Sequence, residues 1–341
     1  MKEGTNMAST FLFALNAVLP IFILIILGYF LKKSNFIDTH FVNILNKFVF
    51  RVGLPVLLFY NVYNINHLSE INWGVVAFAV IGIMLSFFIG ILSLFITTKD
   101  REQKGVILQC IIRSNFALIG IPLAMSLGGV EAVAVVAILS LFTIPLANLL
   151  SVIALNMYHV NEFGERISVK KMMINIISNP LIIGVMLGLF ALLIRSWIPV
   201  VDGELVFSIK NNLTFSYDAM RLLSQTASPM ALIALGGQFE ISVIKPLIKQ
   251  ITLGVMWRIV IVPSIMLSIA YMLEDKIVGM SHSYAALISL FGAPVAVSSA
   301  IMVHEMGGDE KLAAQLVVWT TVFSVFTIFA IVVVFRSLGA L

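Results

Sequence analysis

The sequence has few charged side chains and a single cysteine. Charged residues make up 11% of the 341 residues, whereas globular proteins average about 25%. The one cysteine, Cys110, excludes an intramolecular disulfide and any metal site built from several cysteines. Apolar residues reach 60%, which indicates a polytopic membrane protein. The net charge of +4 gives no indication of nucleic-acid binding in such a chain.

The sequence also lacks the patterns that would indicate an enzyme or an ATP-driven pump. No Gly-Lys-Ser or Gly-Lys-Thr phosphate loop is present, so ATP does not drive this chain directly. The five histidines lie at the ends of predicted spans or in loops, which excludes a buried metal cluster of histidines and carboxylates. No aspartate or glutamate lies at the centre of a predicted span, where a proton-coupled antiporter usually needs one. We expect no enzyme activity and no cofactor.

What the sequence does contain is a series of long apolar stretches. A membrane-crossing helix needs about 20 mostly apolar residues. Ten stretches qualify, at residues 11–31, 42–62, 74–97, 105–127, 131–157, 174–194, 216–238, 247–273, 281–303 and 312–336. The first follows a polar leader that lacks a convincing cleavage site, so it reads as a retained helix. Lysine and arginine are more frequent in the odd-numbered loops, which predicts a multi-pass plasma-membrane protein with both termini extracellular.

A polar connector at residues 158–173 divides the chain into two halves, 1–157 and 174–341, each with five predicted spans. Because five is odd, the second half must insert upside down relative to the first. The fold class we predict is therefore an all-α membrane protein with ten transmembrane helices arranged as two inverted five-helix repeats.

Prolines and glycines recur in register between the two halves. Pro20 precedes Gly28 by eight residues, and Pro180 precedes Gly188 by the same interval. Pro55 in the second span has a counterpart in the seventh, at Pro229. Random placement would not put these residues in register at several points, so the pattern supports an inverted repeat.

Two predicted spans are interrupted by the same device, Gly-x-Pro followed by an apolar residue. The interruptions comprise Gly120, Ile121 and Pro122 in the fourth span and Gly292, Ala293, Pro294 and Val295 in the ninth. Proline removes a hydrogen bond from a helix and clashes with the preceding turn. Since lipid cannot satisfy the freed backbone groups, such a break persists only where protein buries it or where it lines a cavity. Paired interruptions in matching halves indicate the binding site of a transporter.

The predicted breaks favour a negatively charged substrate. Half-helices that begin after Pro122 and Pro294 would present unpaired N–H groups and the positive end of the helix dipole. Two such ends at mid-membrane would bind a carboxylate or another anion. We therefore expect a small organic anion as the substrate.

Polar side chains beside the breaks are further candidates. Asn115 offers two donors and an acceptor near the first break, although a helix–helix hydrogen bond is the simpler role for a membrane amide. Ser298 is a weaker candidate beside the second break. Four polar residues could coordinate Na⁺: Asn115, Thr143, Thr320 and Ser324. Their spacing in the sequence does not prove a sodium site.

Cationic side chains inside predicted spans also favour an anion. Arg113 and Arg258 lie within such spans, and Arg258 is near mid-depth, so both are candidate substrate ligands. Lys47 and Arg51 are also inside a span, but long basic side chains can extend to the interface instead. The sequence does not assign roles to Lys47 and Arg51.

The order and spacing of four motifs resemble those of the auxin efflux carrier family, over nearly the whole chain. The motifs are Asn115…Gly120-Ile121-Pro122, Gly53-Leu54-Pro55…Leu58-Phe59, Asn179-Pro180…Gly188 and Ser228-Pro229…Leu235-Gly236. The resemblance implies crossed broken helices 4 and 9, a scaffold of spans 1, 2, 6 and 7, and a mobile transport part of spans 3–5 and 8–10. It also implies an elevator-type carrier that is often a homodimer through its scaffold helices. Sodium/proton antiporters and bile-acid symporters share this general architecture.

The chain departs from the plant members of that family. Their long cytoplasmic loop is replaced by the short connector Tyr158–Met173, which favours a bacterial permease for malate, malonate or related acids over an auxin exporter. The nearest alternative is a sodium-coupled organic anion symporter of the bile-acid type. A membrane sensor would require a soluble output domain, and none follows Arg336. The sequence leaves the acid, the direction of transport and any coupling to Na⁺ or H⁺ open.

Overall fold

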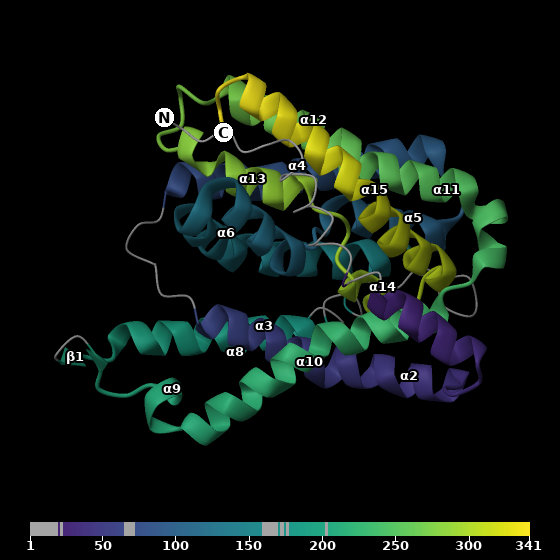
Figure 1. Cartoon of the computed structure of the whole chain (residues 1–341), viewed down its shortest axis with the longest axis horizontal. Helices are drawn as coiled ribbons and strands as arrows, with labels where there is room; N and C mark the ends of the chain where they lie inside the picture. Colours follow the sequence, from purple (N-terminus) through teal and green to yellow (C-terminus); the bar gives the residue numbers. More distant parts are fainter. Residues whose placement is uncertain are drawn as a thin grey trace.

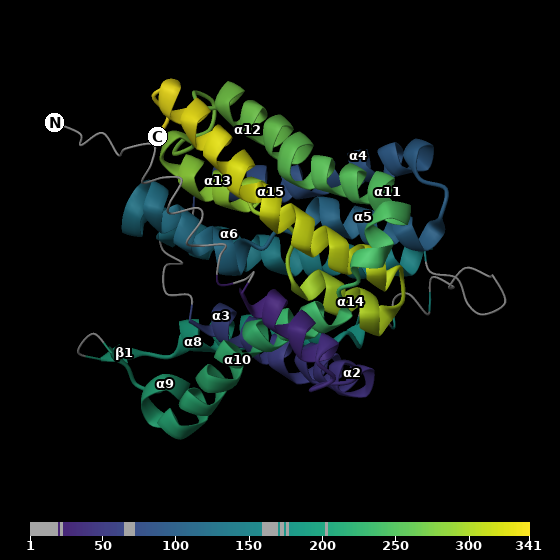
Figure 2. The ribbon, with the colours of Figure 1, turned by 45° about the vertical axis from the view of Figure 1, so that its right-hand side comes forward.

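The protein is organised as two layers of helices. The computed structural model describes residues 23–64, 72–158, 177–201 and 204–341, and the single residues 20, 170 and 174. Figure 1 shows one layer, containing α2, α3, α8 and α10, beneath a thicker layer that contains α4–α6 and α11–α15. The two layers stay separate in the rotated view of Figure 2. The short helix α14 lies in the thicker layer at the boundary between the two.

The thinner layer is built from the early part of each half of the chain. Its elements are the helical segment 23–33, α2 (Thr39–Phe48), the π-turn η1 (Val49–Gly53), α3 (Leu54–Tyr63), α8 (Pro180–Trp197) and α10 (Thr214–Gln238). Between α8 and α10 lie the two-residue strands β1 (Val200–Val201) and β2 (Glu204–Leu205) and the short helix α9 (Ile209–Asn212). The strands pair antiparallel, with Val200 opposite Leu205.

The thicker layer holds the remaining elements. From the first half these are α4 (Trp73–Thr97), α5 (Arg101–Ile112), the π-turn η2 (Phe116–Gly120) and α6 (Ile121–Tyr158). From the second half they are η3 (Ile241–Val243), α11 (Ile244–Met256), the π-turn η4 (Trp257–Ile261), α12 (Val262–Met272), η5 (Ser281–Ser283), α13 (Tyr284–Gly292), α14 (Ser298–Met306) and α15 (Glu310–Ser337). The helix α6 contains a kink at Gly129, whose φ is 65°.

Short polar side chains define where several of these helices begin. The side chain of each such residue accepts a hydrogen bond from a backbone N–H in the first helical turn: Asp38 for α2, Asn72 for α4, Asp100 for α5, Asn179 for α8 and Asp309 for α15. These bonds satisfy donors that have no partner within the helix. These boundaries are therefore determined by local sequence, and the helices begin within six residues of the starts of the predicted spans.

Among the described residues, six helices are long and apolar enough to cross a membrane. They are Thr39–Tyr63, Trp73–Thr97, Glu131–Tyr158, Pro180–Trp197, Ile241–Met272 and Glu310–Ser337. The predicted fourth and ninth spans are each divided into shorter helices, and part of the predicted first span lies outside the described residues, as does most of the connector 158–173. The structure is that of a helical multi-pass membrane protein. Ten spans in an inverted repeat remain a prediction.

Two glycines bring helices of the thinner layer into backbone contact. A Cβ atom at Gly28 would overlap the carbonyl oxygen of Ile233 in α10. A Cβ atom at Gly236, one turn further along α10, would overlap the carbonyl oxygen of Ile25. Small residues at membrane helix interfaces allow this close approach. The segment 23–33 and α10 are therefore packed main chain against main chain.

We predict that Gly236→Ala destabilises the protein, because the backbone of residue 25 cannot move aside as a flexible side chain could. Overpacking of this kind costs about 1–3 kcal/mol. Unfolding of the purified protein in detergent measures the change. Gly292→Ala is the matched control, since the nearest atom to its added methyl group would be Ile331 Cδ1 at 3.6 Å. Equal stability of the two variants would contradict the predicted contact.

Candidate functional site

Two helices of the thicker layer are broken, and their extended segments meet. The helix α5 ends at Ile112 and the chain resumes a helical path at Phe116, the first residue of η2. The helix α13 ends at Gly292, and α14 begins at Ser298. Each gap is filled by extended chain rather than by a loop that leaves the protein.

The two extended segments pair as an antiparallel bridge between Ser114 and Val295. The N–H of Asn115 donates to the carbonyl oxygen of Pro294 at 2.8 Å. On the other side of the bridge, the N–H of Ala296 donates to the carbonyl oxygen of Arg113 at 3.0 Å. The N–H of Val295 itself donates to the Thr320 hydroxyl at 3.2 Å. Backbone groups that the breaks free are thus paired with each other and with α15.

The predicted position of the first break is wrong. The chain is extended at residues 113–115, whereas Gly120 ends the π-turn η2 and Ile121 and Pro122 continue directly into α6. The second break lies at the predicted residues Gly292, Ala293, Pro294 and Val295. Its following half-helix begins four residues after Pro294, however, so neither proline is the first residue after a break.

The π-turns give a physical reason for this difference. Each of the three π-turns in the described part of the chain ends two residues before a proline, at Pro55, Pro122 and Pro263. A proline inside a helix lacks its N–H and clashes with the carbonyl group four residues earlier. That carbonyl lies within the π-turn in all three cases, and the wider turn displaces it. Gly-x-Pro at residues 120–122 is therefore accommodated by a wider turn and does not break the helix.

The side chain of Arg258, in the π-turn η4, caps the C-terminal ends of both broken helices. It is 2% exposed, and among the described residues it donates only to backbone carbonyl oxygens of other segments. The acceptors are Ala293 at 2.9 Å, Ile111 at 3.0 Å, Leu290 at 3.0 Å and Phe291 at 3.1 Å. The sequence predicts Arg258 as a substrate ligand. In the structure its guanidinium N–H groups donate instead to the main chain of the crossing.

Arg113 lies in the first extended segment and is directed elsewhere. It is 5% exposed, and its guanidinium donates to Ser298 Oγ at 2.9 Å and to the sulfur of Met302. Neither Arg113 nor Arg258 takes part in any ion pair found among the described residues. Arg113 is therefore a buried cation with no anionic partner in the described part of the protein.

A cavity of about 90 Å³ lies beside the crossing, between the two layers. Its polar lining from the thicker layer consists of Arg113, Ser114, Asn115, Thr143, Asn148 and Ser298. The thinner layer contributes Asn61 and Leu57 from α3, Leu181 from α8 and Ser228 from α10. Phe116 and Ser298, which begin the half-helices after the two breaks, both line the cavity.

Three buried polar groups in this lining have no hydrogen-bond partner within the described structure. They are the side-chain amide nitrogens of Asn115 and Asn148 and the hydroxyl oxygen of Ser114. A buried amide without a partner costs about 1–3 kcal/mol, so an acceptor from outside the chain would stabilise this arrangement. The sequence predicted Asn115. Asn148 was missed, although an amide within the apolar stretch of the fifth predicted span was a usable signal.

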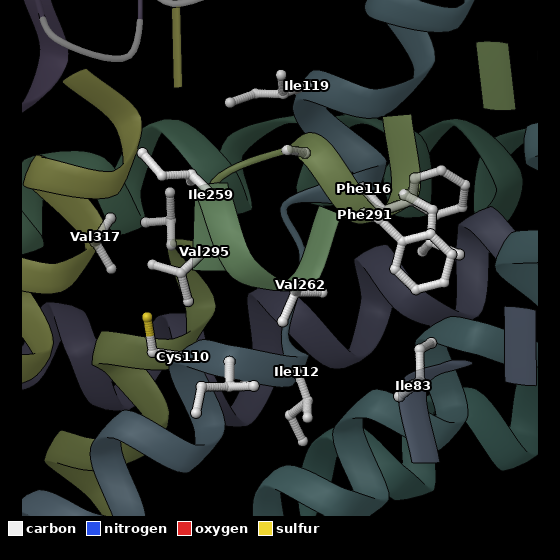
Figure 3. Close-up of a cluster of buried hydrophobic side chains, with 14 of the residues drawn as sticks. Ile83, Cys110, Ile112, Phe116, Ile119, Ile259, Val262, Phe291, Val295 and Val317 are labelled. Carbon is white, nitrogen blue, oxygen red and sulfur yellow. The ribbon is translucent and has the colours of Figure 1, made fainter. Parts of the chain in front are cut away.

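An apolar cluster packs around the crossing. Figure 3 shows Cys110, Val295 and Val317 on one side and Phe116 and Phe291 on the other, and all of these side chains are buried. These apolar side chains lower the local dielectric on their side of the crossing, which strengthens the interaction of a charge with the dipoles there.

A comparison with known protein families agrees with this geometry. The sequence model of a family described as membrane transport protein matches residues 13–332. No protein of curated function matches the chain. The match covers nearly all of the sequence, including both broken helices and every residue that lines the cavity. The chain therefore belongs to the auxin efflux carrier family of membrane transport proteins.

Proposed function

We propose that the protein is a secondary transporter of small organic anions and that it binds its substrate in the cavity beside the crossing. The substrate class comprises carboxylates such as malate, malonate or auxin-like acids. Two observations carry this proposal: the buried guanidinium of Arg113 has no anionic partner among the described residues, and the amide nitrogens of Asn115 and Asn148 have no acceptor there. A carboxylate supplies both the charge and the acceptors that these groups lack.

The helix ends next to the cavity add to the preference for an anion. The half-helices that begin at Phe116 and Ser298 direct their positive ends toward the crossing. The negative ends of the preceding helices are hydrogen-bonded to Arg258. The uncompensated field at the cavity is therefore positive, which is the arrangement that binds anions at helix N-termini.

Alternating access by an elevator-type movement is the mechanism we propose. The cavity is lined by both layers, so a displacement of the thicker layer along the thinner one would carry the crossing and its substrate together. The polar contacts between the layers include long side chains that can form new pairs when one layer moves along the other. Arg51 Nε lies 3.9 Å from Glu305 Oε2, and Gln238 Nε2 lies 3.2 Å from His304 Nδ1.

We further propose a plasma-membrane location with extracellular termini, an inverted repeat and a homodimer formed through the thinner layer. A membrane potential that is negative inside favours export of an anion by about 2.3 kcal/mol per charge per 100 mV. The match to the membrane transport protein family gives no support to the alternative of a bile-acid symporter.

Charge movement on a solid-supported membrane tests the function directly. The purified protein in lipid vesicles is challenged with malate, malonate, lactate, citrate and indole acetate, and with an organic amine as the opposite charge. The proposal expects a transient current for at least one acid and none for the amine. A current for the amine alone would refute the electrostatic reasoning.

We predict that Arg113→Gln abolishes most of the transport current, because the substrate loses its charged partner in a buried site. Removing one member of such a pair costs about 2–5 kcal/mol. Arg113→Lys should retain part of the activity, since lysine keeps the charge but not the planar donor fork. Arg221→Gln serves as the control, because Arg221 is half-exposed and pairs with Asp218 at 3.0 Å on α10. Full activity of Arg113→Gln would contradict the proposed site.

Replacing an amide by a carboxylate in the cavity gives an independent prediction. Asn115→Asp and Asn148→Asp keep the side-chain size but place an acceptor, and a negative charge, where a donor now lies. We expect both to raise the KM for the acid more than Asn115→Ser and Asn148→Ser, which only remove the donor. The concentration dependence of the transport current measures KM for each variant. If KM rose equally in the aspartate and serine variants, these positions would not be in contact with the substrate's negative charge.

A further inference from the structure

The guanidinium of Arg258 is surrounded by carbonyl oxygens, which are ligands of the kind that bind inorganic cations. We propose that the C-terminal ends of α5 and α13 form a cation-binding site and that the side chain of Arg258 occupies it as a permanently attached cation. In consequence, transport needs no sodium ion at the crossing. This consequence rests on the proposed function, whereas the cation site itself does not.

The ligand set is built from main chain alone. The carbonyl groups of Leu290 and Phe291 lie in the last turn of α13, and that of Ile111 lies in the last turn of α5. The carbonyl of Ala293, in the second extended segment, completes the set. Carbonyl oxygens at interrupted helices are the groups with which broken-helix transporters coordinate Na⁺.

The charge of Arg258 matches the charge that the site requires. A helix C-terminus carries about −0.5 elementary charge, so two such ends together are balanced by about one cation. The guanidinium also provides enough N–H donors for every acceptor in the set. An additional cation would therefore be bound without electrostatic benefit.

The space around Arg258 leaves no room for a second, hydrated cation. The cavity that it lines together with Ile111, Leu290 and Phe291 measures about 10 Å³, which is about the minimum for a single water molecule. Gly254, four residues earlier, lets α11 pack closely on α15, because a Cβ atom there would lie 2.5 Å from the side chain of Leu316. The guanidinium itself lies within 3.1 Å of all four carbonyl oxygens, so it fills the site.

Arg113 differs from Arg258 in every one of these respects. It bonds to the side chains of Ser298 and Met302, lines the larger cavity and lies next to the N-terminal ends of the following half-helices. The two buried arginines thus have separate tasks. Arg258 balances the negative helix ends within the crossing, while Arg113 faces the substrate.

Chemical rescue tests the cation site without any transport measurement. Arg258→Ala removes the guanidinium and leaves the carbonyl groups and a vacant volume of matching shape. We expect millimolar guanidinium chloride to raise the thermal midpoint of purified Arg258→Ala, by an amount that grows with concentration as for any ligand of the folded state. The wild-type protein and Arg221→Ala control for the denaturing action of guanidinium, and choline chloride controls for ionic strength. The same response in all three proteins would overturn the proposal.

A second measurement uses the wild-type protein and does not depend on the folding of a variant. The transport current is recorded with sodium replaced by N-methylglucamine, and we expect its amplitude to be unchanged. A current that required sodium would refute the role of Arg258 as the resident cation. If no acid gave a current at all, the proposed function would fail, but the rescue of Arg258→Ala would still decide whether the cation site exists.

Discussion

The structure depends on how backbone groups are satisfied where two helices break inside the apolar core. An unsatisfied amide or carbonyl group costs several kcal/mol in such surroundings, so breaking two helices separately would be prohibitive. Here each extended segment supplies the partner of the other, through the bridge between Ser114 and Val295. Carbonyl groups at the ends of the two helices that do not take part in the bridge accept hydrogen bonds from Arg258.

This solution makes the crossing electrically asymmetric. The C-terminal ends of α5 and α13 are bonded to a guanidinium, whereas the N-terminal ends at Phe116 and Ser298 border the cavity. One side of the crossing is therefore neutralised, and the other side keeps its positive field. Arg113, Asn115 and Asn148 lie on the second side. The arrangement that satisfies the backbone groups of the two breaks within an apolar core also gives the cavity its preference for a negatively charged ligand.

The sequence predicted features that depend on local pattern and missed those that depend on tertiary contacts. The apolar runs predicted where the helices lie, and capping residues that the sequence analysis did not use, such as Asn72 and Asp100, define where α4 and α5 begin. The first break was misplaced because residues 113–115 contain neither glycine nor proline; their extended path is imposed by pairing with the second segment. Arg258 was identified as an unusual buried cation, but no property of the sequence indicates that its partners are carbonyl groups of other helices.

The bridge between the two extended segments has a consequence for how this protein can evolve. Because the bridge is made by main-chain atoms, it does not depend on which side chains the participating residues carry. Positions of the two segments that line the cavity can thus change without loss of these main-chain hydrogen bonds. Substrate preference can then diverge among descendants of one ancestor by single replacements in the lining, while the framework that positions those replacements is inherited intact.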